Sequence, residues 1–254
     1  MTRPPRDEDQ ASSGCDLQRR RVLGGVARTL FSGGALVVGL NACSTASRSS
    51  STPQPDWPTV AGGNAGSIPK PGVAPAAAVD PRFANVAART SWTTMLPDYK
   101  GMNRMKPIRA VTVHHDGLPS PLASSRSRDA EDRLRTIRRG HVNHNGWADI
   151  GYHFAIDRSG RVWSCRPLVW QGAHVKDRNE GNIGVLVLGN FEIERPTSAQ
   201  LNALAIHLKT LVTAYRIDQR KVYTHREWPG AATACPGRNL QPAVNRIRAR
   251  GLVA

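Results

Sequence analysis

Two histidines and one cysteine are the residues of this 254-residue chain best suited to chemistry. His114 ends the apolar run Ala110-Val-Thr-Val-His114, and His225 and Cys235 lie ten positions apart in one polar segment. Two imidazole nitrogens and one thiolate are suitable zinc ligands, and three protein ligands leave the fourth tetrahedral position open, as in catalytic sites. The set therefore predicts a catalytic metal site and a hydrolase, although no helical period brings the three residues together.

Four segments around these residues carry a family resemblance. They are, in order, Asp149-Ile-Gly-Tyr-His-Phe154, Gln171-Gly-Ala-His174, Asn182-Ile-Gly-Val-Leu-Val-Leu-Gly-Asn190 and Thr233-Ala-Cys-Pro-Gly237. From about Thr90 to Ala254 the chain resembles the zinc N-acetylmuramoyl-L-alanine amidases of the type 2 and peptidoglycan-recognition-protein group. The resemblance implies a small α/β domain that cleaves the bond between muramic acid and the first L-alanine of the stem peptide.

The resemblance also implies which residues hold the metal. His114, His225 and Cys235 match the family's zinc ligands, and the first of the paired histidines is the ligand, which selects His114 over His115. Because successive side chains of a strand point to opposite faces, the two imidazoles of the pair have different roles. His115 is then a neighbour of the site.

Two further residues match positions that the resemblance connects with catalysis. Tyr152 corresponds to a tyrosine that points at the substrate, where a protonated phenol can donate a hydrogen bond to developing negative charge. The alternative is a core tyrosine on a strand. Thr233 falls where relatives carry lysine or threonine and would donate a neutral hydrogen bond. Leu186 stands where the cytoplasmic branch of the family carries a glutamate, which argues against that branch.

Four residues are candidates for substrate binding. Recognition proteins that bind meso-diaminopimelate stem peptides carry a Gly-Trp pair and an arginine at the matching positions. This chain has Gly146, Trp147 and Arg166 there. An arginine can bind the additional carboxylate of that residue through a bidentate pair, and the glycine leaves room for it. The alternative is that Trp147 belongs to the core and Arg166 to the surface. His174 is expected near the groove, with orienting or packing roles as open as substrate contact.

The hydrophobic pattern predicts one α/β domain with a central mixed sheet flanked by helices. Strands are expected at 108–114, 150–156, 161–165 and 183–188, the middle two joined by a tight turn at 158–160. A helix is expected after Thr197-Ser198, which can cap it, with an apolar stripe of Leu201, Leu204, Ala205, Leu208, Leu211, Val212 and Tyr215. His207 lies off that stripe and is expected at the surface. Weaker stripes predict helices around 130–137 and 243–252.

The first 89 residues are expected to lie outside this domain. Residues 1–43 contain the twin-arginine-like stretch Gln18-Arg-Arg-Arg-Val-Leu23 and end in Leu40-Asn-Ala-Cys43, which resembles a lipoprotein processing box. We expect export and a lipid anchor at Cys43, with simple cleavage or a permanent membrane anchor as alternatives. Residues 44–89 are rich in Ser, Pro, Ala and Gly and read as a disordered linker, which leaves 90–254 for the amidase domain.

Charge and cysteine content bear on the partner and the compartment. The net charge is +16, of which residues 1–43, with six arginines and four acidic residues, account for +2 and leave +14. This balance favours an anionic partner, and for an exported bacterial protein the carboxylates of peptidoglycan or muropeptides are expected rather than nucleic acid. Location in the cell envelope, in the periplasm, follows. A disulfide between Cys165 and Cys235 is the alternative that would destroy the metal site.

Three classes of function therefore stand beside one another. The presence of all three ligands favours an amidase, because relatives that only recognise their ligand usually lack at least one. A non-catalytic, muropeptide-binding envelope lipoprotein is the second class. A structural cell-wall tether that uses only the lipid and the basic surface is the third.

Overall fold

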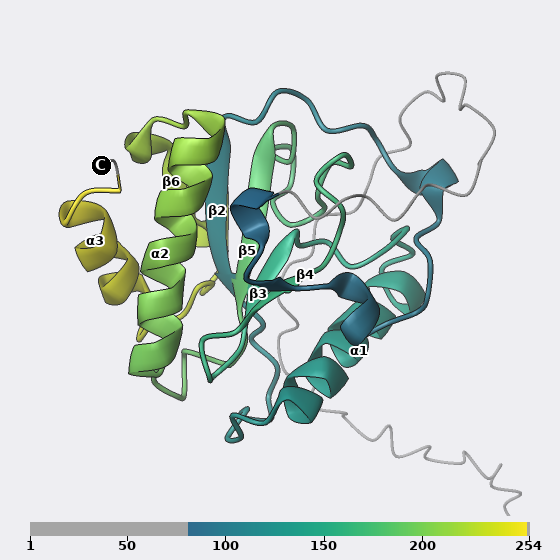
Figure 1. The fold of residues 1–254 in the computed structure, drawn as a ribbon, viewed down its shortest axis with the longest axis horizontal. Helices are drawn as coiled ribbons and strands as arrows, with labels where there is room; N and C mark the ends of the chain where they lie inside the picture. Colours follow the sequence, from purple (N-terminus) through teal and green to yellow (C-terminus); the bar gives the residue numbers. More distant parts are fainter. Residues whose placement is uncertain (1–80, 253–254) are drawn as a thin grey trace, which may run out of the picture. The chain divides into compact units, whose positions relative to one another are not determined.

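The computed structural model describes residues 81–252, which form a six-stranded sheet with helices on both faces (Figure 1). The expected signal segment, the lipid site at Cys43 and most of the expected linker lie outside the described residues. The sheet has the order β1-β4-β3-β5-β2-β6. Its strands are β1 (Val86–Ala87), β2 (Ala110–His115), β3 (Phe154–Ile156), β4 (Val162–Ser164), β5 (Asn182–Val187) and β6 (Val222–Thr224). The helices are α1 (Ser127–Asn143), α2 (Ser198–Tyr215) and α3 (Gln241–Ala249).

The sheet is mixed, as the sequence predicts. Strands β3, β5, β2 and β6 run parallel to one another, whereas β4 is antiparallel to β3 and parallel to β1. The reversal between β3 and β4 is a tight turn in which the carboxylate of Asp157 accepts from the backbone N–H groups of Ser159 and Arg161. Gly160 occupies that turn at φ 83°, a conformation that favours glycine.

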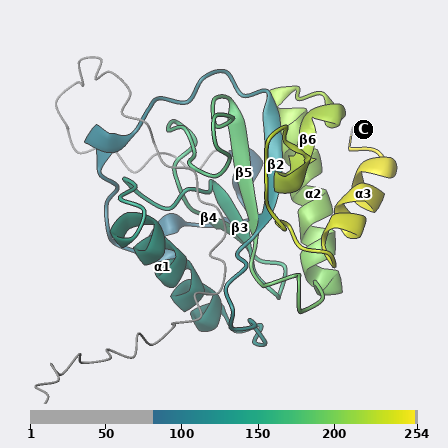
Figure 2. The same ribbon diagram turned by 180° about the vertical axis from the view of Figure 1, so that it is seen from behind.

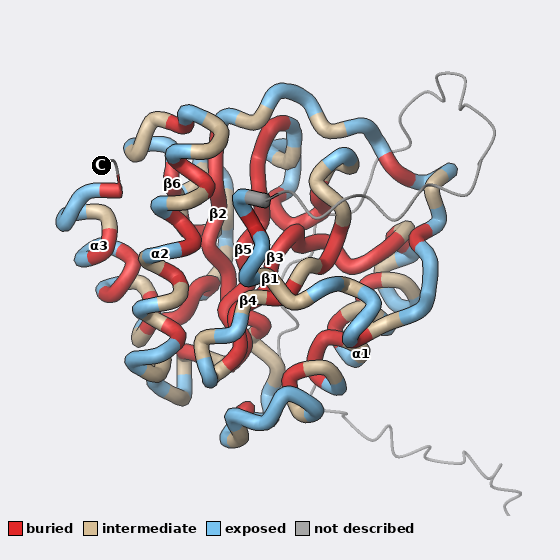
Figure 3. Tube along the Cα trace, viewed as in Figure 1, coloured by how far each residue is buried: buried red, intermediate tan, exposed pale blue. Residues whose placement is uncertain are grey.

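Helices lie on both faces of the sheet (Figures 1 and 2), and a cluster of buried apolar side chains fills the space on each face. Helices α2 and α3 pack on the face that contains Val111 and Val113, and α1 packs on the opposite face, to which Leu186 belongs. Strands β2, β3 and β5 are buried along their whole length, whereas β1 and most of β4 are partly exposed (Figure 3). Because β2 alternates, Thr112 and His114 point toward the α1 face. The expected site therefore lies on that face of the sheet.

The second helix confirms its predicted cap but corrects one predicted surface residue. Thr197 caps α2 in a reciprocal capping box with Gln200. His207, expected at the surface, is only 4% exposed, and its ring packs between Phe83 and Phe154. The reason is periodicity: position 207 follows Leu204 by three residues and therefore falls within the buried stripe. Burial lowers the pKa of His207 to about 4, so its ring is neutral at neutral pH.

Other differences concern the limits of strands and of the domain. The strand predicted from 150 begins only at Phe154. Gly151 bonds outside the sheet, to Nδ1 of His141 and to the backbone N–H of Ala173, whereas His153 already donates its backbone N–H to Gly184 of β5. Strands β1 and β6 were not predicted. Ordered contacts begin ahead of Thr90, since β1 pairs with β4 and Phe83 lies in the core. Across residues 81–252, no helix has the length and apolar character that crossing a membrane requires.

A buried ion pair holds α1 against the end of β2. Asp116, directly after the strand, accepts two hydrogen bonds from the guanidinium of Arg133, at 3.0 and 2.7 Å. Its carboxylate also accepts from the backbone N–H groups of Gly189 and Leu118. The two side chains of the pair are 8% and 0% exposed. Four donors thus compensate the buried charge and fix the end of the strand that carries His114.

We expect Arg133→Met to lower the free energy of unfolding by about 3–5 kcal/mol, because it leaves the Asp116 carboxylate buried without its partner. Arg126→Met is the matched control: Arg126 also pairs with an aspartate, Asp129, but its side chain is 80% exposed. That loss should stay below about 1 kcal/mol. Urea unfolding of the three proteins measures both values. Equal losses would show that the buried pair has no special role.

Candidate metal and catalytic site

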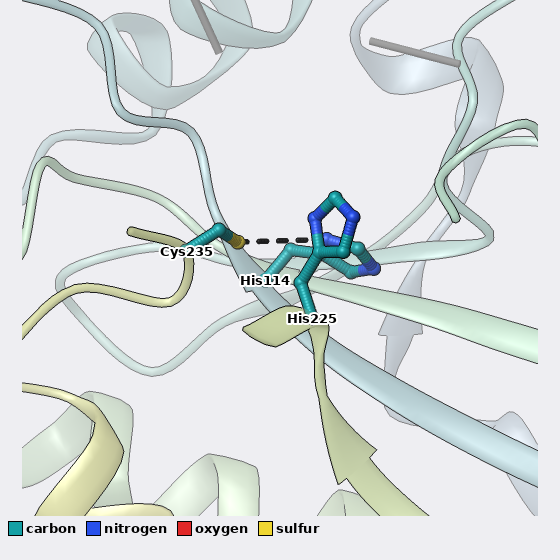
Figure 4. A group of neighbouring side chains, drawn as sticks. All are labelled: His114, His225 and Cys235. Atoms are coloured by element: carbon teal, nitrogen blue, oxygen red, sulfur yellow. Dashed lines mark hydrogen bonds between the residues drawn. The ribbon is translucent and has the colours of Figure 1, made fainter. Parts of the chain in front are cut away.

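The three predicted ligands come together on the α1 face of the sheet. His114 is the fifth residue of β2, and His225 follows directly after β6, whose Thr224 pairs with Val113. This parallel register places the two imidazoles side by side, with ring centroids 4.8 Å apart. Cys235 enters from the loop before α3, and its Sγ lies 3.6 Å from Nδ1 of His114 (Figure 4). The ligand atoms of all three residues lie within 4.8 Å of one another.

Backbone contacts fix the cysteine in this place. The backbone N–H of His115 donates to Sγ of Cys235 at 3.4 Å, and the backbone N–H of Arg226 donates to the Cys235 carbonyl oxygen at 3.0 Å. Gly237, two residues later, has φ 93°, and a Cβ there would lie 2.5 Å from the backbone carbon of Phe191. Glycine is therefore required at 237 for both conformation and space. Main-chain contacts of this kind leave no signal in residue types and therefore cannot be predicted from the sequence.

Burial sets the protonation of the ligands. It lowers the pKa of His114 well below the ordinary value, with the neighbouring His225 adding to the effect, and it lowers the pKa of His225 to about 4. Both imidazoles thus keep a lone pair at neutral pH. Burial also raises the pKa of the Cys235 thiol to about 12, while the N–H of His115 opposes this shift. A cation held between the three groups would supply the positive charge that a buried thiolate needs, so the donor set fits zinc.

The two predicted catalytic residues flank this group. Tyr152 is 1% exposed, and the centroid of its ring lies 5.1 Å from that of His114. Burial raises the pKa of Tyr152, and Cys235 raises it further, so the phenol remains protonated. The hydroxyl oxygen of Thr233 accepts from the backbone N–H of Cys235 at 3.1 Å and keeps its own proton for donation. The ring of Tyr152 therefore lies beside one candidate ligand, and the hydroxyl of Thr233 lies beside the backbone of another.

Of the residues predicted to bind the stem peptide, Gly146 is exposed, whereas Trp147 and Arg166 are buried. Gly146 is exposed at φ 67°, a conformation that favours glycine, and a Cβ there would meet no heavy atom of the protein within 4 Å. Trp147 is 3% exposed and packs against His141. Arg166 is 4% exposed and donates to three carbonyl oxygens, those of Asp149, Ile150 and Gln171. The alternative of a core tryptophan matches this placement, whereas that of a surface arginine does not.

His174, for which the sequence left orienting, packing and substrate-contact roles open, lies behind the candidate ligand His114. It is 1% exposed, and its Nδ1 lies 3.1 Å from Nε2 of His114. Its Nε2 lies 3.2 Å from the carbonyl oxygen of Asn182. Both ring nitrogens thus face protein atoms, and this geometry favours the orienting role among the three that the sequence left open. The sequence placed the residue near the site, but only the fold shows which atoms it meets.

Two alternatives raised by the sequence are also resolved by position. Cys165 and Cys235 are both free and buried, so the alternative disulfide is absent from the described residues. Leu186 pairs with His114 across β5 and β2 and is fully buried. An apolar side chain thus occupies the place where the cytoplasmic branch carries a glutamate.

Comparisons with known proteins agree with this arrangement. A family described as N-acetylmuramoyl-L-alanine amidase matches residues 104–238, more than half of the chain. The human N-acetylmuramoyl-L-alanine amidase is 33% identical over 108 residues, which are 42% of this chain and 19% of that protein. A peptidoglycan-recognition protein of Drosophila simulans is 30% identical over 162 residues, 62% of this chain and 84% of that protein.

Among solved structures, a mutant of Drosophila peptidoglycan-recognition protein LB in complex with tracheal cytotoxin has a TM-score of 0.57 and 26% identity. The match covers 63% of this chain and 93% of that one. The chain spans less than a quarter of the length of the human and pig amidases that it matches. The match to the family over residues 104–238, together with these relatives, shows that the chain belongs to the N-acetylmuramoyl-L-alanine amidase family that includes the peptidoglycan-recognition proteins.

Proposed function

We propose that this chain is a zinc-dependent hydrolase that cleaves the amide bond between N-acetylmuramic acid and L-alanine in peptidoglycan. Membership of the amidase family supports the reaction class. The observation that carries the proposal is the complete ligand set, because the donor atoms of His114, His225 and Cys235 lie within 4.8 Å of one another. A protein that only binds peptidoglycan without cleaving it needs no set of three metal ligands.

Each residue then has a distinct task. Zinc, when bound, polarises the scissile carbonyl and lowers the pKa of water toward about 7. His114 and His225 hold the metal as neutral donors, and the Cys235 thiolate offsets part of its charge. Tyr152 donates its phenolic proton in a hydrogen bond to the oxygen on which negative charge develops. Thr233 offers a second, neutral hydrogen bond from the loop that carries the cysteine.

The second candidate is a non-catalytic, muropeptide-binding protein of the cell envelope. A solved relative, peptidoglycan-recognition protein LB, is named in complex with tracheal cytotoxin, so binding is within the range of the fold. Muropeptide binding alone would not require a buried thiol beside two neutral imidazoles. Zinc content and release of free stem peptide separate the two candidates.

We keep meso-diaminopimelate stems as the proposed substrate type. Three donated bonds from Arg166 go to carbonyl oxygens, and a guanidinium has five N–H groups, so two remain. A bidentate carboxylate needs two. Arg166 thus positions the segment 149–150 beside β4 and, in this proposal, also meets the additional carboxylate.

The proposed place of action follows from the substrate and from the amino terminus. A family that acts on peptidoglycan implies a location associated with the cell wall. Twin-arginine export, lipidation at Cys43 and residence in the bacterial periplasm remain proposals, because residues 1–43 lie outside the described residues. Cys43→Ala, followed by membrane fractionation, tests the lipid anchor, since an anchored protein should become soluble.

Cys235→Ser and His225→Ala should each lose bound zinc and turnover together, because each removes one of three ligands. Release of stem peptide from purified sacculi and metal analysis of the same samples measure the two effects. His144→Ala is the control, since His144 is an exposed histidine at the end of α1. Its zinc content and activity should equal those of the wild type. Full activity with normal zinc in either ligand variant would refute the site.

Tyr152→Phe should lower kcat by about 10²–10³-fold and leave zinc content unchanged, because it removes one donor to the developing oxyanion and no ligand. Steady-state kinetics on a defined muramoyl peptide, with zinc measured in the same preparation, tests this. A variant that keeps its kcat would make Tyr152 a core residue.

Arg166→Ala should reduce kcat/KM for diaminopimelate stems about ten- to hundred-fold more than for lysine stems, because only the former offer the additional carboxylate. The comparison is made between two substrates of one variant, so a general loss of stability cancels. Equal losses on both stem types would restrict Arg166 to its three carbonyl contacts.

A further inference from the structure

His174 lies at the centre of a hydrogen-bonded chain that ends at the candidate metal position. Its Nε2 faces the carbonyl oxygen of Asn182 at 3.2 Å, and its Nδ1 faces Nε2 of His114 at 3.1 Å. On the far side of the second ring, Nδ1 of His114 faces Sγ of Cys235 at 3.6 Å. The Asn182 carbonyl on β5, the His174 ring in a loop and the His114 ring on β2 thus form a line that ends at Nδ1 of His114.

The carbonyl oxygen of Asn182 determines which nitrogen of each imidazole in this hydrogen-bonded series carries the proton. A carbonyl oxygen can only accept, so Nε2 of His174 carries a proton. A ring that is 1% exposed is neutral, and Nδ1 of His174 is then an acceptor. Nε2 of His114 must donate to it. The neutral His114 ring therefore has no proton on Nδ1, and that lone pair points toward Cys235.

The carbonyl at the start of the chain is itself fixed. The side chain of Asn182 donates to the carbonyl oxygen of Arg178 at 2.8 Å and accepts from the hydroxyl of Thr112 at 3.0 Å. The backbone N–H of His174 donates to the side chain of Asn179 at 2.9 Å. Residues 179–182, which lead into β5, therefore hold both the backbone N–H and the ring of His174.

Two glycines leave room for the His174 ring and for little else. A Cβ at Gly184 would lie 2.6 Å from Cδ2 of His174, and a Cβ at Gly172 would lie 2.5 Å from the same atom. Both distances are far below van der Waals contact, so any other residue at either position would displace the ring. Gly184 also donates its backbone N–H to His153, which fixes the neighbouring imidazole.

We infer that His174 is a positioning residue that fixes the tautomer and orientation of His114, so that its Nδ1 lone pair is presented to the metal. This inference rests on the proposed function. Groups that hold a metal-ligating histidine through its other nitrogen orient the ring and raise its basicity, and their loss typically lowers metal affinity about 10–100-fold. The residue does not touch substrate.

The first test compares zinc affinity in substituted proteins, measured by competition with a chromogenic chelator. His174→Phe keeps a ring but removes the acceptor, and it should raise the Kd for zinc about 10–100-fold. His174→Asn places an amide oxygen near the former Nδ1 and should restore part of the affinity. His207→Phe is the matched control, because His207 is also a buried histidine but lies on the other face of the sheet. Its Kd should be unchanged.

A second test needs no substitution that affects folding. Long-range proton–nitrogen NMR of the wild-type, metal-free chain reports which nitrogen of each histidine carries the proton. We expect the Nε2–H form for both His114 and His174. An Nδ1–H form of His114, or an unchanged zinc Kd in a folded His174→Phe variant, would overturn the inference. A wild type that binds no zinc would refute the proposed function instead, while the tautomer result would still stand on its own.

Discussion

The parallel pairing of β2 with β6 is the constraint on which the site depends. It places His225 beside His114 although the two residues are 111 positions apart in the sequence, and Cys235, ten positions after His225, returns to the same point. Hydrogen bonds of the ladder fix the backbone of both strands, so the imidazoles are held by rigid elements. The buried pair of Asp116 and Arg133 secures the end of β2 against α1.

The same geometry explains why the site lies on a face of the sheet rather than at its edge. His114 projects from a central strand into the α1 layer, where Tyr152 and His174 surround it. Burial in this layer keeps the imidazoles neutral and the phenol protonated, and it strengthens every electrostatic interaction that a metal makes there. A polar group of this size is tolerated in a core because its members bond to one another and to main-chain atoms.

Several of these features could be predicted from the sequence, and the reasons are local. Alternation along 110–114 assigned His114 to the face opposite Val111 and Val113, and Thr197 carried a capping signal. His207 was misplaced because the stripe was drawn through apolar residues alone, so position 207 was taken to lie off it although it follows Leu204 by three residues. Strands of two and three residues, β1 and β6, are too short for a periodic signal. The partners of Arg166 and His174 include backbone carbonyls, which every residue possesses, so no motif reveals them.

The position of β6 at the end of the sheet has a consequence for how the chain opens. This strand has three residues and one neighbour, and α3 and the cysteine loop follow it. Elements at such an edge are the first to exchange their amide protons, because few contacts must break. A metal ion shared by His114, His225 and Cys235 would tie this last part of the domain to a central strand. Loading with metal would then protect the segment from β6 to the end of α3 from local opening, and the same ion would act in catalysis and in stabilising the fold.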